Sequence, residues 1–363
     1  MTRVQRVVSD TLGGVSGQRF TSTIGSTSGP DGLEHVTAQF GIGAVQRVRH
    51  LPDGLMNDNW RIEADAGNFA LKRIRDVPLD TARRNLRTLA ALAEAGVPVP
   101  TPVLSLEADP VVTVGQHGFS LLSWIDGHHQ RGNDLALPEV TELGTLLGRL
   151  HEILNRSTTG LPPAFNAPSA SVTAPGTALA QIDRYVARLA TLDEPTPFDG
   201  EAVHFLAQRR LLLEKYADER PTLEVPAGPF GWTHGDFQHR NLLWRDGEVV
   251  AVLDWDRIRV RPFGEEAART ATVQFGGEDG LLDLERISAF MDGYRSVIAI
   301  SPAELEDAVS RLWWKRMTDP WVLVFHYDRG DHSCDQLFAP QERLLAWWTE
   351  RREEVVSAFT AKA

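Results

Sequence analysis

The chain has 363 residues, of which 42% are hydrophobic and 24% charged, and its 37 Lys and Arg against 49 Asp and Glu give a formal net charge of −12. This is ordinary globular composition, which excludes a disordered chain or a coiled coil, and the length favours about two domains. The surplus of carboxylates argues against a nucleic-acid partner, the single cysteine excludes a disulfide framework, and no apolar stretch reaches the ~20 residues of a membrane span, so we expect a cytoplasmic protein without a membrane partner.

The N-terminal part of the sequence predicts a flexible leader followed by an antiparallel sheet. Residues 1–34 are expected to form the leader, because residues 9–34 are rich in Ser, Thr and Gly and have too little apolar surface to offset the entropy of ordering. Ordered structure is expected to begin near Val36. Three strands follow within residues 47–74, separated by turn sequences at 52–54 and 65–67.

One helix and two more strands complete this N-terminal lobe. The helix is predicted over residues 80–96, where leucines recur at helical spacing before a terminating glycine. Short apolar runs at 111–114 and 119–125 predict the last two strands. The lobe is therefore expected to span residues 35–125.

The remainder, residues 126–363, is predicted to be a mainly helical lobe that carries one β-hairpin. Helical periodicity is present at 140–154, over a long stretch from 177 to 217, and in roughly three or four helices between 281 and 359. The hairpin consists of NLLW, the turn RDG and VVAVLDW, in which apolar strands flank an Asp-Gly turn.

The densest group of polar residues brackets this hairpin. The loop HGDFQHRN ends at Asn241, directly before the first strand, and Asp254 ends the second strand. Because a tight hairpin brings its two ends together, we expect Asn241 and Asp254 side by side, where an amide and a carboxylate oxygen suit Mg²⁺. Asp236 would face the same cavity, placed to orient an attacking hydroxyl and accept its proton, while His234 braces the loop. The alternative is a polar loop that only caps the hairpin.

The loop and the later Asp254 resemble the signature of the aminoglycoside phosphotransferase and choline kinase branch of the protein-kinase-like fold. Five further segments are similar to that family, in the family's order: GLMNDNWRI, FALKRI, LAEAGVPVPTP, FSLLSWIDG and LGTLLGRLHE. The first of them looks like the nucleotide-covering loop of the homoserine kinase-like members. The resemblance implies a bilobal α/β fold, with a small antiparallel-sheet N-lobe carrying one helix, a mainly helical C-lobe and a nucleotide between them.

The resemblance also implies an enzyme that uses ATP and Mg²⁺ to phosphorylate a small molecule. The γ-phosphate would pass to a hydroxyl of a sugar, an amino sugar, an aminoglycoside-type antibiotic or an amino alcohol such as homoserine, and the sequence does not choose among them. Asp236 is the expected base, and Asn241 and Asp254 are the expected metal ligands.

Further residues are assigned to the nucleotide by the same resemblance. Lys72 would neutralise phosphate charge, Gly54 would let the backbone approach the phosphates closely, and Asn57 would add an amide donor. The family's hinge, which offers backbone groups to adenine, falls on Ser123, Trp124 and Ile125.

Two positions depart from the family pattern. Asn85 stands where members carry a helix Glu that pairs with the strand lysine, and Glu94 is a distant substitute. This departure supports an alternative function, a nucleotide-binding pseudokinase that acts as a regulator or scaffold, whereas the intact Asp236 opposes it. Glu266 is expected in place of an Asp that often follows the metal ligand.

A second polar window, HYDRGDHSCD, lies near the C-terminus. Members of the family build the acceptor pocket from the helical C-terminal region, so Asp328, Asp331 and Asp335 are expected to hold hydroxyl or ammonium groups of the acceptor. The window also contains His and Cys, but the spacing matches no zinc pattern, so a structural metal is not expected there.

Overall fold

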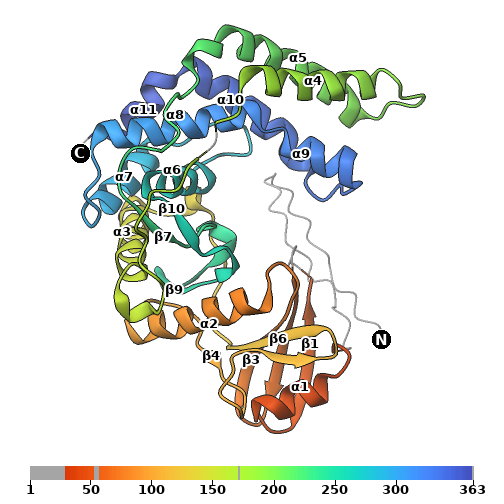
Figure 1. Ribbon diagram of the computed structural model, residues 1–363, viewed down its shortest axis with the longest axis vertical. Helices are drawn as coiled ribbons and strands as arrows, with labels where there is room; N and C mark the ends of the chain where they lie inside the picture. Colours follow the sequence, from red (N-terminus) through yellow and green to blue (C-terminus); the bar gives the residue numbers. More distant parts are fainter. Residues whose placement is uncertain (1–28, 53–56, 171, 362–363) are drawn as a thin grey trace, which may run out of the picture.

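An antiparallel sheet occupies one end of the molecule and helices fill the other, as the computed structural model of residues 29–52, 57–170 and 172–361 shows (Figure 1). The predicted bilobal α/β fold, with a sheet N-lobe and a mainly helical C-lobe, is thereby confirmed. Most of the predicted leader, and Gly54, lie outside the described residues. The boundary between residues 125 and 126 stays a prediction.

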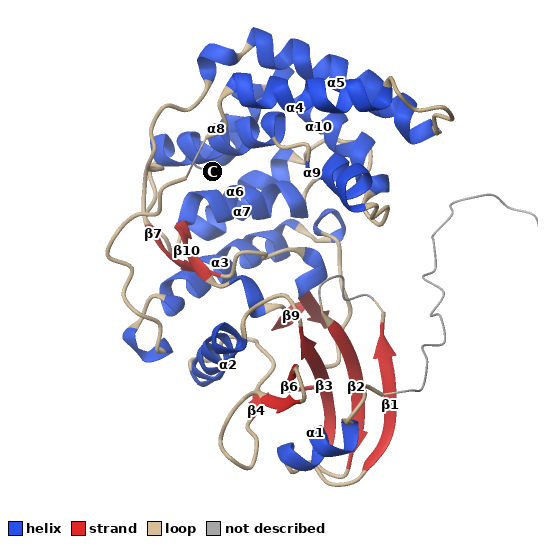
Figure 2. Cartoon of the chain, turned by 45° about the vertical axis from the view of Figure 1, so that its right-hand side comes forward, coloured by secondary structure: helices blue, strands red, loops and turns tan. Residues whose placement is uncertain are grey.

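The N-terminal sheet has the strand order β1-β2-β3-β6-β4, with β5 paired to β6. Its strands are β1 (Val45–Leu51), β2 (Asp58–Ala64), β3 (Gly67–Ile74), β4 (Pro102–Val103), β5 (Val112–Val114) and β6 (His117–Ser123). Alternation along β2 and β3 buries Trp60, Ile62 and Leu71 on one face. Figure 2 shows β1, β2 and β3 side by side. This sheet places Lys72 opposite Asn59 and Ser120, toward the helical lobe.

Two helices accompany the sheet, so the expectation of a single helix was wrong. α2 (Leu79–Glu94) matches the predicted helix. α1 (Leu33–Phe40) was not predicted, and it begins inside the expected leader. Its Val36 and Phe40 are buried in one cluster with the sheet residues, because they recur at helical spacing on one face.

The C-terminal lobe is built almost entirely from helices. Their bounds are α3 (Leu137–Leu154), α4 (Pro175–Leu189), α5 (Pro197–Lys215), α6 (Phe263–Gln274), α7 (Leu284–Arg295), α8 (Pro302–Thr318), α9 (Trp321–Leu323), α10 (Phe338–Glu350) and α11 (Arg352–Thr360). Within the described ranges, none of these helices is long and apolar enough to cross a membrane.

The predicted continuous helix from 177 to 217 is in fact two helices, α4 and α5. The chain leaves α4 after Leu189 and re-enters a helix at Thr196, whose hydroxyl accepts a hydrogen bond from the Asp199 backbone N–H. The Asp199 carboxylate accepts in return from the Thr196 N–H, and Pro197 occupies the first helical position. These signals begin a new helix, and α4 and α5 pack together at one edge of the lobe (Figure 1).

Close contact between α3 and α7 depends on glycine. A Cβ on Gly144 of α3 would lie 2.0 Å from the Phe290 carbonyl oxygen, and one on Gly293 of α7 would lie 1.9 Å from the Thr141 carbonyl oxygen. Any side chain at these positions would push the two backbones apart. α3 also contacts β7 (Phe230–Thr233), the strand that leads into the polar loop.

The predicted hairpin is confirmed as β8 (Leu242–Arg245) and β9 (Glu248–Val252). Its turn residues Asp246 and Gly247 both have positive φ, 54° and 81°, as the favoured two-residue hairpin turn requires. A second pair, β7 with β10 (Arg259–Pro262), was not predicted. The two short ribbons hold the loop 234–241 and the segment 253–258 next to each other.

Candidate active site

His234 fixes the start of the loop between β7 and β8. The ring is fully buried, its Nε2 lies 2.9 Å from the Leu253 carbonyl oxygen, and its Nδ1 accepts a hydrogen bond from the Asp236 N–H at 3.1 Å. One neutral tautomer satisfies both contacts, and burial lowers the pKa of the imidazole. His234 therefore ties the loop to the end of the hairpin through backbone groups, as predicted.

The Asp236 carboxylate is held on both oxygens. Oδ1 accepts from Arg269 Nη2 at 2.8 Å, and Oδ2 accepts from Gln238 Nε2 at 2.8 Å and from Asn241 Nδ2 at 3.0 Å. Burial acts to raise the pKa of Asp236, but the Arg269 guanidinium and the hydrogen bonds outweigh burial and hold it below its ordinary value. Asp236 is thus an oriented, ionised carboxylate at neutral pH.

Asn241 and Asp254 stand at the two open ends of the hairpin, as expected from the sequence. The Leu253 N–H donates to the Asn241 carbonyl oxygen at 2.8 Å, so the residue before Asp254 is paired with Asn241 itself. Asn241 donates through Nδ2 to Asp236, and among the described residues no donor engages its Oδ1. Asp254 adopts a left-handed conformation (φ 58°), and its side chain is 40% exposed. This oxygen donor set fits a hard cation such as Mg²⁺.

Lys72 crosses from the sheet to the segment that follows the hairpin. Its Nζ lies 2.5 Å from Asp256 Oδ2 and 3.4 Å from Asp254 Oδ1. Burial acts to lower the pKa of the ammonium, but the two carboxylates outweigh burial and raise it. Asn57 also donates to Asp256, at 2.9 Å, while its Oδ1 accepts from the Arg75 N–H. The phosphate roles of Lys72 and Asn57 stay predictions.

Asn85 does not face Lys72 in the way that a helix Glu would. Its Nδ2 donates to the Trp255 carbonyl oxygen at 2.9 Å, and its Oδ1 accepts from Arg84. Asn85 therefore anchors the backbone of the turn Trp255–Arg257, which carries Asp256. The acid that pairs with Lys72 comes from this turn and not from α2. This partner was not predicted, although Asp256 lies only two residues after Asp254 in the sequence.

Two residues of α6 contact the loop between β7 and β8. Glu266 accepts from the Gly235 N–H and lies 2.8 Å from His151 Nε2, whose Nδ1 contacts the Tyr294 hydroxyl at 2.9 Å. Burial acts to raise the pKa of Glu266, but the hydrogen bond and charge of His151 outweigh it and leave the pKa at about 2. One turn further along α6, Arg269 reaches Asp236. Arg269 lies three residues after Glu266 and therefore near it on α6, and this spacing could have predicted that Arg269 approaches the same loop.

The predicted hinge leaves the sheet at the end of β6. The Ser123 N–H donates to Thr101 and the Trp124 N–H donates to Asn68, so both amides already have protein partners. The Trp124 ring is covered by the Arg61 guanidinium at 4.6 Å. Contact of Ser123, Trp124 and Ile125 with adenine stays a prediction.

The three acidic residues of the C-terminal window lie in different surroundings. Asp328 accepts from Arg184 and Tyr185 of α4, both at 2.9 Å, whereas Asp331 accepts from the Ser333 N–H at the surface. Asp335 contacts His326 and His332. The structure does not bring the three carboxylates together, and their role toward an acceptor stays a prediction.

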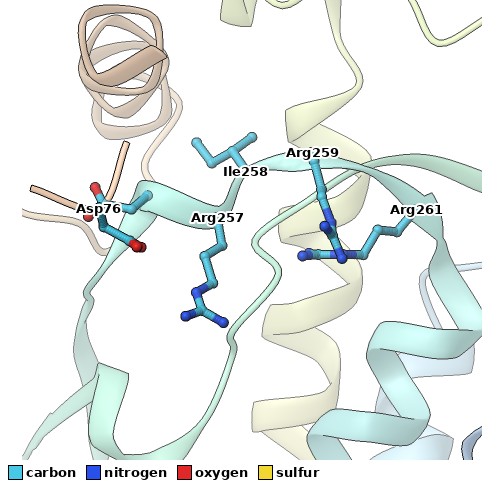
Figure 3. Close-up of a pocket in the computed structure, with 6 residues that line it drawn as sticks. Asp76, Arg257, Ile258, Arg259 and Arg261 are labelled. Carbon is cyan, nitrogen blue, oxygen red and sulfur yellow. The ribbon is translucent and has the colours of Figure 1, made fainter. Parts of the chain in front are cut away.

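A cavity of about 350 Å³ adjoins Asp256 on the side of β10 (Figure 3). Arg259 and Arg261 line it from alternate positions of β10, and Arg257 lines it from the 3-10 turn before that strand; among the described residues none of the three has an ion-pair partner. Burial, with help from Arg259, lowers the pKa of Arg261 to about 10. The cavity therefore attracts anions.

The sequence is similar to those of known phosphotransferases. A profile of the phosphotransferase enzyme family matches residues 47–299. The homoserine kinase of Janthinobacterium sp. (strain Marseille) is 21% identical over 307 residues, which cover 82% of this chain and 87% of that protein.

Solved structures agree on the fold. Spectinomycin phosphotransferase in complex with ADP and spectinomycin has a TM-score of 0.59 at 15% identity, with 90% of this chain and 96% of that chain covered. An amicoumacin kinase in complex with AMP-PNP, Ca²⁺ and its antibiotic has a TM-score of 0.57 at 17% identity, with 92% and 96% covered.

Proposed function

This chain belongs to the phosphotransferase enzyme family, which makes it a small-molecule kinase-like phosphotransferase, and from that membership we propose that it transfers the γ-phosphate of ATP to a hydroxyl of its acceptor. The observation that carries the proposal is the convergence of four side chains from two lobes. Asn241 contacts Asp236 through its side chain and pairs through its backbone with the residue before Asp254, and Lys72 reaches Asp254 from the sheet at 3.4 Å.

Asp236 is the proposed base. Its position between Arg269, Gln238 and Asn241 fixes the direction of the carboxylate, so that an acceptor hydroxyl bound against it is oriented for attack and its proton passes to a carboxylate oxygen. The lowered pKa keeps Asp236 ionised before the transfer.

Asn241 and Asp254 would hold Mg²⁺, which when bound supplies neutralisation of the phosphate charge. Asn241 Oδ1, which accepts from no donor in the part of the chain that the structure describes, and the exposed carboxylate of Asp254 support this assignment, since both supply oxygen ligands at the same end of the hairpin. Lys72 adds a second positive charge from the opposite lobe, and Asp256 keeps it in place.

A hydroxy amino acid such as homoserine is the acceptor that the surroundings favour. Arg269 donates to Asp236, and Arg316 lies near Arg269. Nη1 of Arg269 and Nε of Arg316 are buried without a hydrogen-bond partner among the described residues. This positive charge suits an acceptor that carries a carboxylate and disfavours a polycationic antibiotic. The homoserine kinase relative supports the same choice.

The test is an assay of ADP release with Mg²⁺ and ATP on a panel of homoserine, sugars, amino sugars, aminoglycosides and amino alcohols. We expect turnover with homoserine or another hydroxy acid, with the phosphorylated product identified by mass spectrometry. If ATP binds but no acceptor is turned over, the enzyme proposal fails and the pseudokinase alternative replaces it. Turnover of an aminoglycoside but not of hydroxy acids would reject only the acceptor class.

A further inference from the structure

Three ligating side chains converge between α9 and α10, outside the proposed active site. His326 Nδ1 and His332 Nδ1 lie 3.0 Å apart, and Asp335 places a carboxylate oxygen 2.9 Å from the first and 3.2 Å from the second. All three come from one stretch of ten residues, which leaves the π-helical segment Val324–Asp328 and returns at a 3-10 turn that begins with Asp335. π-helical turns occur often at functional sites.

Hydrogen bonding alone does not satisfy this arrangement. If both Nδ1 atoms donate to Asp335, their two N–H groups face each other at 3.0 Å. If one Nδ1 instead accepts from the other, its lone pair faces the Asp335 carboxylate, because a neutral imidazole nitrogen either donates or accepts. One repulsive contact remains in either case, and a central cation that accepts all three lone pairs removes it.

The distances match those of a metal site. For metal–ligand bonds of about 2.1 Å, neighbouring ligands of an octahedron lie about 3.0 Å apart. The three distances among His326, His332 and Asp335 are 3.0, 2.9 and 3.2 Å. Two histidines and one carboxylate on one face are a known ligand set for divalent first-row metals.

The surrounding residues hold the buried ligand in place. The His326 ring stacks on Phe198 of α5, with centroids 4.0 Å apart and planes 11° apart, and its side chain is only 12% exposed. His332 is 64% exposed, so an ion can enter from solvent on that side. The site is therefore largely formed before a metal arrives, which reduces the cost of binding.

We propose that His326, His332 and Asp335 bind one divalent first-row transition metal ion in octahedral coordination, for which Co²⁺ and Zn²⁺ serve as probes. The ion would cross-link the two ends of the ten-residue stretch between α9 and α10. Because His326 stacks on Phe198, it would also fix this stretch against α5. Imidazole nitrogen ligands distinguish this site from the oxygen site at Asn241 and Asp254, which suits Mg²⁺. Asp335 then serves the metal and not the acceptor.

The test is titration of the full metal-free chain with Co²⁺ and with Zn²⁺, in the presence of excess Mg²⁺, by calorimetry and by the visible absorption of Co²⁺. We expect one bound ion in the wild type, and at least a tenfold weaker Kd in His332→Ala and in Asp335→Asn. His204→Ala, which removes an exposed imidazole from α5, is the matched control and should bind as the wild type does. Thermal unfolding should show that the ion stabilises the wild type and the control but not His332→Ala.

Three outcomes would overturn the proposal: no ion bound by the wild type under these conditions, undiminished binding by His332→Ala, or loss of the ion in Asp254→Asn instead. Because His332 is exposed, its replacement should leave the unfolding transition of the metal-free chain unchanged, so weaker binding would not reflect misfolding. The titration needs no acceptor, and its result is independent of the proposed kinase activity.

Discussion

Lys72 of β3 and Asp256 of the turn after β9 form an ion pair of 2.5 Å across 184 residues of sequence. The turn also positions Asp254, so one short segment supplies both the proposed metal ligand and the partner of the lysine. Asn85, which occupies the place of the expected helix acid, anchors that segment by its backbone. The negative charge that pairs with Lys72 is thus supplied by Asp256 and not by the residue at position 85.

Asp256→Asn should reduce use of ATP. The change keeps the shape of the side chain but removes the charge that holds Lys72, and a charge-assisted hydrogen bond of this kind corresponds to roughly a 10- to 100-fold loss in kcat/KM for ATP. Steady-state kinetics with varied ATP measures the effect. Asp76→Asn, at the wall of the same cavity, is the control and should change kcat/KM little. An unaltered value in Asp256→Asn would show that Lys72 does not depend on this partner.

Arg269 should act as a positioning residue for Asp236. Arg269→Gln is expected to lower kcat roughly tenfold while KM for ATP stays near the wild-type value, because the carboxylate loses the contact that fixes its Oδ1. Arg269→Lys should restore part of kcat, since it returns the positive charge. The control is Arg257→Gln, an arginine of the neighbouring cavity. Equal kcat in Arg269→Gln and the wild type would contradict this role.

Glu266 should make stability depend on acid pH. Its pKa is lowered from 4.5 to about 2 in the folded protein, so its stabilising contribution is complete above about pH 4.5 and is lost as the pH falls toward 2. Glu266→Gln should lower the free energy of unfolding at neutral pH by about 3 kcal/mol. Its stability should also decline less than that of the wild type between pH 4.5 and 2.

Denaturant unfolding at a series of pH values tests this expectation. Glu353→Gln, at an exposed position of α11, is the control and should follow the wild-type curve. Parallel curves for the wild type and Glu266→Gln between pH 4.5 and 2 would mean that the buried carboxylate is not the group that titrates.

Gly144→Ala should destabilise the protein although alanine favours helices. The new Cβ would meet the Phe290 carbonyl oxygen at 2.0 Å, and separation of α3 from α7 is expected to cost about 2 kcal/mol. Gly200→Ala in α5 has no heavy atom within 4 Å and should be neutral or stabilising by up to about 1 kcal/mol. Both are measured by denaturant unfolding. Stability of Gly144→Ala at or above the wild-type level would exclude close backbone contact there.

The sequence predicted those parts of the site that depend on local geometry. The Asp246–Gly247 turn and the apolar strands around it define the hairpin, and the hairpin alone brings Asn241 to the residue next to Asp254. The segments that resemble the family then placed Lys72 on a strand, β3, from which its Nζ reaches Asp254.

The parts that were missed depend on tertiary contacts or on overlooked local signals. The sequence around Asp256 does not predict its ion pair with Lys72, because the pair forms only when the two lobes come into contact. Arg269 is likewise brought to Asp236 by the docking of α6. By contrast, two missed features had local signals in the sequence. The helical spacing of Val36 and Phe40 predicts α1, and the capping residue Thr196 predicts that α5 begins separately from α4.

The most direct test of the account is single-turnover phosphate transfer by Asp236→Asn, measured with bound ATP, Mg²⁺ and the acceptor identified by the panel. We expect the variant to bind ATP as the wild type does but to transfer the phosphate at least about 100-fold more slowly, because the oriented base is gone. Transfer at the wild-type rate with the same bound ATP would contradict the assignment of Asp236.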